Sequence, residues 1–148
     1  MADPAGERAR EGGPDRGSVL LLMPAAVLVV LVLGAIAVDA AVAFLAEREL
    51  AGAAAAAAND AATAGLDEVA LRQGAAYRLD PSLVEAAVAA SLDAQGVPPG
   101  TSVSIDVAGD EVRVTLAAEA DLVFSPSIPG APDTVAVSAT ASAAAISR

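Results

Sequence analysis

The chain has 148 residues, a formal net charge of −11 and 55 % hydrophobic residues, but only two Phe, one Tyr and no Trp. The absence of Cys and His excludes disulfides, Cys/His zinc sites, thiol nucleophiles and imidazole general bases. The acidic balance predicts repulsion from nucleic-acid phosphates, so we expect no nucleic-acid partner.

Residues 1–17 are rich in Gly, Pro and charged side chains and hold almost nothing apolar, which predicts a disordered tail. Residues 19–38 then carry no charge at all. With a rise of about 1.5 Å per residue, a helix of this length measures roughly 30 Å and matches the hydrocarbon core of a bilayer. We therefore expect a transmembrane helix over residues 18–39, with the lipid bilayer as its first partner.

Two alternatives stay open for this segment. A cleavable secretory signal would use the small-x-small pattern Ala35-Ile36-Ala37, although the apolar stretch is longer than the usual core of such signals, roughly 7–15 residues. A buried helix of a soluble protein normally keeps a polar stripe, whereas this segment is apolar all the way round.

Arginine placement predicts the orientation of the span. Arg8, Arg10 and Arg16 precede it, whereas only Arg48 follows it closely. An excess of positive charge on one side of a span marks the cytoplasmic side. We therefore expect a single-pass cell-membrane protein with a cytoplasmic tail over residues 1–17 and an extracytoplasmic remainder.

No strong helix breaker follows the span until Gly65, and residues 53–58 are all alanine. We expect the helix to continue outside the membrane as an alanine-rich exterior segment within residues 40–74, including a further helical turn over 66–73. Small side chains allow helices to approach closely. Two uses are open: contact with helices of other envelope proteins, or packing on the chain's own C-terminal domain.

Residues 75–148 predict a small extracytoplasmic α+β domain. Asp80-Pro81 begins a short amphipathic helix that ends at Gly96, with Asp as the N-cap and Pro at the first helical position. The residues expected on its apolar face are Leu83, Val84, Ala87, Val88 and Leu92.

Alternation with period two then predicts a small antiparallel sheet. The expected strands cover residues 103–107, 112–116, 120–124 and 134–141, and the first two form a hairpin around a turn at 108–111. The residues expected on its buried face are Val103, Ile105, Val107, Val112, Val114 and Leu116. Because aromatic residues are scarce, we expect a thin core.

Five features follow one another in the first half of the chain. They are a tail ending in Arg16-Gly17-Ser18, a span containing Pro24, the stretch Gly34-Ala35-Ile36-Ala37-Val38-Asp39, the spacing Leu45-x-x-Arg48-x-Leu50, and Asn59-Asp60-Ala61-Ala62. In this order they resemble the TadE/TadG-like proteins of the bacterial tight-adherence (Flp) pilus system. The resemblance covers residues 15–64 and implies a pilin-like minor component or assembly factor that is anchored by its N-terminal helix and exposes its C-terminal domain.

In pilin-like members of this family, a prepilin peptidase cuts after a Gly, and a Glu five residues into the mature chain assists assembly. A cut between Gly17 and Ser18 would place Leu22 at that position. This departure favours an uncleaved, TadG-like anchor. Gly17 and Ser18 stay open as either a processing site or a flexible turn at the membrane entry.

Three residues are candidate helix–helix contacts: Gly34, Asp39 and Arg48. An ionisable residue beside a span indicates function, so Asp39 either lies at the solvated outer edge or meets a partner on another helix. Arg48 belongs to the cluster Glu47-Arg48-Glu49, which we interpret as a solvated collar or a docking point.

We expect no catalytic, cofactor-binding or metal site. Adjacent carboxylates such as Asp110 and Glu111 diverge on a strand or helix and do not make an acid/base pair. The sequence contains no nucleophile-elbow, phosphate-binding or metal motif. We therefore expect no enzyme, but a structural or assembly component of a pilus-like envelope apparatus, with other pilus-assembly or envelope membrane proteins as partners. The alternative is a membrane-tethered extracytoplasmic binding module, unrelated to pili, that recognises a ligand through its sheet edge or through residues 125–133.

Overall fold

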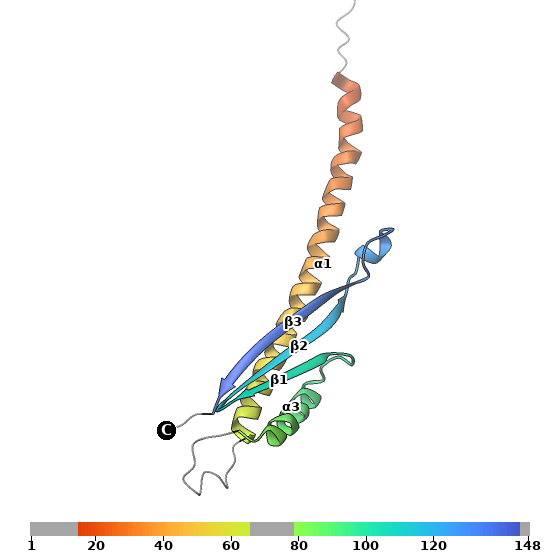
Figure 1. Ribbon diagram of the computed structural model, residues 1–148. Helices are drawn as coiled ribbons and strands as arrows, with labels where there is room; N and C mark the ends of the chain where they lie inside the picture. Colours follow the sequence, from red (N-terminus) through yellow and green to blue (C-terminus); the bar gives the residue numbers. More distant parts are fainter. Residues whose placement is uncertain (1–14, 66–78, 146–148) are drawn as a thin grey trace, which may run out of the picture.

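The structure is a computed structural model that describes residues 15–65 and 79–145, with side chains from residue 22 onward. Its elements are helix α1 (Asp15–Ala64), helix α3 (Pro81–Gln95), strand β1 (Ser102–Ala108), strand β2 (Glu111–Asp121), the 3₁₀ helix η1 (Ser125–Ser127) and strand β3 (Thr134–Ala144). Figure 1 shows the sheet lying along the C-terminal half of α1, with α3 beside the end of that half. The fold is α+β, as the sequence predicts.

Helix α1 is one continuous helix of 50 residues, with Pro24 accommodated inside it. At about 1.5 Å per residue it is roughly 75 Å long. The predicted uninterrupted helix is therefore confirmed, but it begins earlier than expected, because residues 15–17 of the predicted tail are already helical. Residues 1–14, and the helical turn expected over 66–73, lie outside the described residues.

The N-terminal part of α1 is exposed. Among the described residues, one helix is long and apolar enough to span a membrane, over Leu22–Ala64, and only 6 % of its most apolar window is buried. Length and composition alone do not separate a membrane span from a signal sequence. A core helix of a soluble protein, by contrast, buries its apolar side chains, and this window does not.

Helix α3 begins and ends where the sequence predicts. Asp80 is its N-cap and accepts hydrogen bonds from the Ser82 backbone N–H (2.8 Å) and hydroxyl (2.7 Å), and Gly96 closes the helix in the left-handed conformation. Val84, Val88 and Leu92 are buried, as expected. Leu83 is exposed instead, because it points away from α1 and the sheet while its neighbour Val84 faces them.

The Asp80 cap predicts a pH-dependent contribution to stability. The Ser82 hydroxyl, and then the Ser82 backbone N–H, lower the pKa of the Asp80 carboxyl. A lowered pKa stabilises the fold above the unfolded value of about 3.9, and this stabilisation is lost as the pH falls through the folded pKa. We expect Asp80→Ala to lower the melting temperature at pH 7 and to have a shrinking effect below about pH 4. Thermal melts by circular dichroism at pH 7, 5 and 3 measure this, and an effect independent of pH would contradict it.

The sheet has three antiparallel strands in the order β1-β2-β3. The sequence predicted two separate strands over 112–116 and 120–124. This prediction is wrong, because residues 111–121 form one strand that pairs with β3 from Glu111↔Ala144 to Asp121↔Thr134. The adjacent Ala117 and Ala118 interrupt the alternation of apolar and polar residues in the sequence, but the pairing with β3 continues through them. Residues 122–124 leave the sheet, and β3 extends to Ala144, three residues beyond its expected end.

The core is thin and built of small side chains, as expected. The alanines of α1 that are buried against the sheet and α3 are Ala53, Ala54, Ala57, Ala58, Ala61 and Ala62. From β2, Val112, Val114 and Leu116 are fully buried. Val103 of β1 is exposed, contrary to expectation, because it lies on an edge strand beyond the cover of α1 and α3. Of the two uses predicted for the alanine segment, these side chains serve packing on the chain's own domain.

Gly65 marks a close approach of backbone and side chains at the end of α1. A Cβ atom there would lie 2.6 Å from the Ala61 carbonyl oxygen and 2.6 Å from Val84 Cγ2. We expect Gly65→Ala to lower the free energy of unfolding by about 1–3 kcal/mol. The matched control is Gly52→Ala, which meets nothing within 4 Å and should raise it by up to about 1 kcal/mol. Urea unfolding of the detergent-solubilised chain checks both, and equal effects would contradict the packing.

Candidate functional site

Asp39 joins the long helix to the loop between β2 and β3. Its Oδ1 accepts hydrogen bonds from the backbone N–H groups of Val123 (2.8 Å) and Phe124 (2.9 Å). Its Oδ2 accepts from the Ser125 backbone N–H (2.8 Å) and from the Ser125 hydroxyl (2.6 Å). Three successive N–H groups that converge on one anion form a nest, and here the chain's own carboxylate fills it. We call this arrangement the Asp39 clamp.

The loop that receives Asp39 is folded by its own hydrogen bonds. The Ser127 N–H donates to the Phe124 carbonyl (3.0 Å), and the Ile128 N–H donates to the Ser125 carbonyl (2.9 Å), which together make the η1 turn. The first N–H groups of any helical turn have no partner within it. Asp39 accepts from the first N–H group of this turn, that of Ser125, and from the two N–H groups that precede it, so it caps the turn from another element.

The clamp corrects the interpretation of Asp39. The sequence favoured a solvated carboxylate or a partner on another helix, but the side chain is only 9 % exposed, and all four of its donors come from the loop of the same chain. The residues that sequence reasoning missed are Val123, Phe124 and Ser125. The available signal was Ser125-Pro126, since Ser followed by Pro is typical of a helix start that needs an acceptor for its N–H groups.

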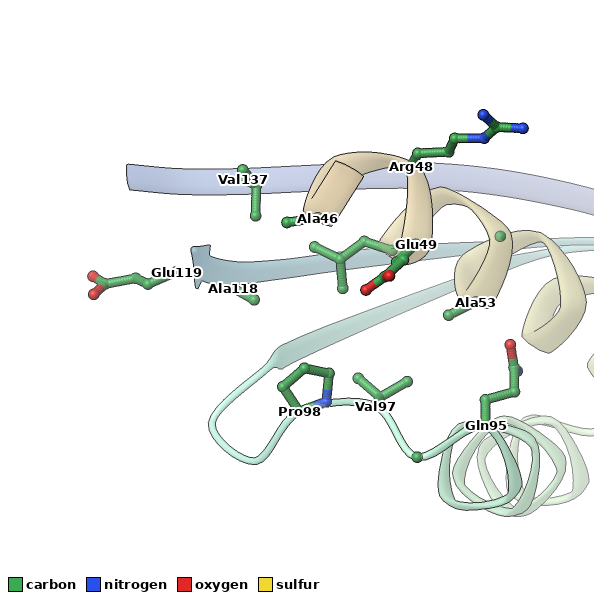
Figure 2. Close-up of a pocket in the computed structure, with 13 residues that line it drawn as sticks. Ala46, Arg48, Glu49, Ala53, Gln95, Val97, Pro98, Ala118, Glu119 and Val137 are labelled. Carbon is green, nitrogen blue, oxygen red and sulfur yellow. The ribbon is translucent and has the colours of Figure 1, made fainter. Parts of the chain in front are cut away.

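The other two candidate contacts lie away from the clamp. At 100° per residue, Gly34 and Arg48 are about 40° apart around α1, and Asp39 lies roughly 140–180° from both. Gly34 is exposed, and a Cβ there would meet nothing within 4 Å. Arg48 is exposed as well, and Figure 2 shows its guanidinium pointing away from the neighbouring groove. Gly34 and Arg48 are therefore exposed residues on nearly the same side of α1, and Asp39 lies on the opposite side.

Gly17 and Ser18 lie within α1 and have helical backbone. The predicted alternative, a flexible turn at these two residues, is therefore wrong, because their backbone belongs to α1, which begins at Asp15. Processing between them stays a prediction.

A groove of about 350 Å³ opens between α1, the turn after α3, and the sheet. Its floor is apolar and includes Leu50, Ala53 and Val137, and Val97 and Pro98 form one wall. Glu49 reaches into the space above this wall, as Figure 2 shows, while Glu119 extends outward at one end. The groove could hold a small apolar group beside a carboxylate.

Charged side chains elsewhere in the domain are dispersed. Within residues 15–65 and 79–145, no group of three or more carboxylates is placed to hold a metal ion. Asp110 and Glu111 do not act as a pair, since Glu111 approaches Arg113 instead, with Arg113 Nη2 3.5 Å from Glu111 Oε1. That ion pair is exposed and contributes little to stability.

In comparisons with known proteins, no protein-family model, no curated protein and no solved structure matches the chain.

Proposed function

We propose that this chain is a single-pass, membrane-anchored structural or assembly component of a bacterial Flp/Tad pilus-like envelope apparatus, similar to TadE/TadG-like proteins. The observation that carries the proposal is the division of α1. Its N-terminal half is apolar and exposed, while its C-terminal half is covered by the folded domain. An exposed apolar helix of this length is stable when hydrocarbon surrounds it.

Three further features support this role. Arg8, Arg10 and Arg16 before the span favour a cytoplasmic N-terminus and an extracytoplasmic domain. The side of α1 that carries Gly34 and Arg48 is exposed and offers a surface for helices of partner envelope proteins. The exposed surface of the domain is acidic, which suits a solvated outer part. The protein acts through anchoring and packing, not through catalysis.

The experiment that tests the proposal uses the native bacterium. Deletion of the gene is expected to abolish or strongly reduce pili and surface adherence, and the full chain supplied in trans should restore them. A second strain carries the chain without residues 19–38, with a signal sequence supplied for export, and we expect no restoration. Normal piliation in the deletion strain would overturn the pilus role. Mass analysis of the membrane-derived protein decides in addition whether Ser18 becomes the first residue.

A second candidate function rests on the groove between α1 and the sheet. A membrane-tethered module, unrelated to pili, would hold an apolar ligand against Leu50 and Val137, with Glu49 at the rim. Apolar hollows with a few polar groups are the usual form of small-molecule sites. This candidate predicts unchanged piliation in the deletion strain and a ligand that raises the melting temperature of the purified chain.

A further inference from the structure

The loop between β2 and β3, residues 122–133, lies beside the apolar part of α1. Figure 1 shows this loop at the end of the hairpin that is directed toward the N-terminal half of the helix. An apolar hollow of about 710 Å³ separates the two. It is lined on the helix by residues from Val30 to Asp39, and on the loop by Phe124, Ser125, Ser127 and Ile128.

The hollow places the loop at the level of the proposed span. Val30 and Asp39 are nine residues apart, which corresponds to about 13 Å along the helix axis. The outer half of a hydrocarbon core is roughly 15 Å thick. A bilayer that surrounds the helix up to Asp39 would therefore also surround the part of the loop that faces Val30.

The loop has the side chains for such an environment. Residues 122–132 carry no charge in a chain whose net charge is −11, and Asp121 and Asp133 flank them on both sides. Its large apolar side chains are exposed to an unusual degree: Val123 is 56 %, Phe124 44 % and Ile128 55 % exposed. Phe124 is moreover one of only two phenylalanines in the chain.

Most backbone N–H groups of the loop are already hydrogen-bonded. Of its twelve residues, Pro126, Pro129 and Pro132 have no N–H group, which leaves nine. Seven of these nine donate hydrogen bonds within the protein. The donors are Leu122, Val123, Phe124, Ser125, Ser127, Ile128 and Ala131. Unsatisfied backbone donors prevent most loops from entering hydrocarbon, and this loop has few of them.

From these observations we propose that the loop formed by residues 122–133 inserts into the outer half of the bilayer beside α1, as a second membrane contact. Lipid acyl chains occupy the hollow between Ile128 and Val30. Asp39 holds the loop against the helix, and Asp121 and Asp133 limit the depth of insertion. This inference rests on the proposed membrane anchor.

The test uses single-cysteine variants of the full chain, which has no cysteine of its own. Ile128→Cys and Val123→Cys are labelled with a polarity-sensitive fluorophore and reconstituted in phosphatidylcholine vesicles at low protein density. Val30→Cys reports on the span, and Ser104→Cys, exposed on β1, is the matched control outside the membrane. Lipids brominated at known acyl positions then quench the labels according to depth.

We expect the label at residue 123, beside Asp39, to be quenched most strongly by bromines near the headgroup end, the label at residue 128 by bromines deeper in the same leaflet, and the label at residue 104 to remain unquenched. Quenching at residue 30 alone would overturn the inserted loop and leave the anchor in place. No quenching at residue 30 would overturn the anchor and the loop together. A label at residue 128 that is shielded only at high protein density would identify a second copy as the occupant, and would also overturn the proposal. Circular dichroism of each labelled variant verifies its fold.

Discussion

Asp39→Ala is expected to release the loop between β2 and β3 from the helix. Three backbone N–H groups and one hydroxyl lose their acceptor in a partly buried site, in which Asp39 itself is only 9 % exposed. Buried donors without a partner are costly, so the loop should move to regain other partners. We expect amide hydrogen exchange at Val123, Phe124 and Ser125 to accelerate by roughly 10- to 100-fold. Exchange measured on the chain in lipid nanodiscs checks this.

Two companion variants sharpen the result. Ser125→Ala removes one donor and leaves the three N–H groups in place, so its effect on exchange should be smaller. Asp106→Ala removes an exposed carboxylate from β1 and should leave the loop amides unchanged. If Asp106→Ala and Asp39→Ala accelerate exchange equally, the clamp has no special role.

Ala57→Leu is expected to separate α1 from the sheet and α3. Ala57 is fully buried in an interface of alanine side chains, which leaves no room for the three additional carbon atoms. Overpacking of this kind costs typically 1–3 kcal/mol, and a tight alanine interface places it near the upper end, at about 3 kcal/mol. The measurement is urea unfolding followed by the circular dichroism of the sheet.

The matched control makes the same chemical change two residues away. Ala55 is exposed on α1, so Ala55→Leu keeps the interface intact and should change the free energy of unfolding by less than about 0.5 kcal/mol. A comparable loss in both variants would show that the alanine face does not pack on the domain. Weakened binding to partner proteins in Ala55→Leu alone would instead indicate that the exposed side of the helix, which carries Ala55, is the docking surface.

Local signals predicted the helices well. Asp80-Pro81 and Gly96 fix the two ends of α3 through backbone chemistry that depends on adjacent residues only, and the helix boundaries follow. The continuity of α1 beyond residue 38 follows from helix propensity over a stretch without a strong breaker before Gly65. These features need no knowledge of the rest of the fold.

Features that depend on distant partners were predicted incompletely. The break in alternation at Ala117 and Ala118 suggested two strands, but the ladder with β3 carries β2 through it. The Asp39 clamp joins residues 84 to 86 positions apart, and no periodicity encodes such a contact. The sequence marked Asp39 as unusual and left its partner unidentified, because the nest exists only after the hairpin has formed.

The clamp also sets an order of assembly within the fold. The donors to Asp39 lie between β2 and β3, and β3 follows every other described element in the chain. Until β3 has paired with β2 and the loop between them has folded, the Asp39 carboxylate lacks all four of its donors. The last described strand therefore completes the bond between the first helix and the sheet: a chain cut before β3 keeps the Asp39 carboxylate but has no folded loop to cap.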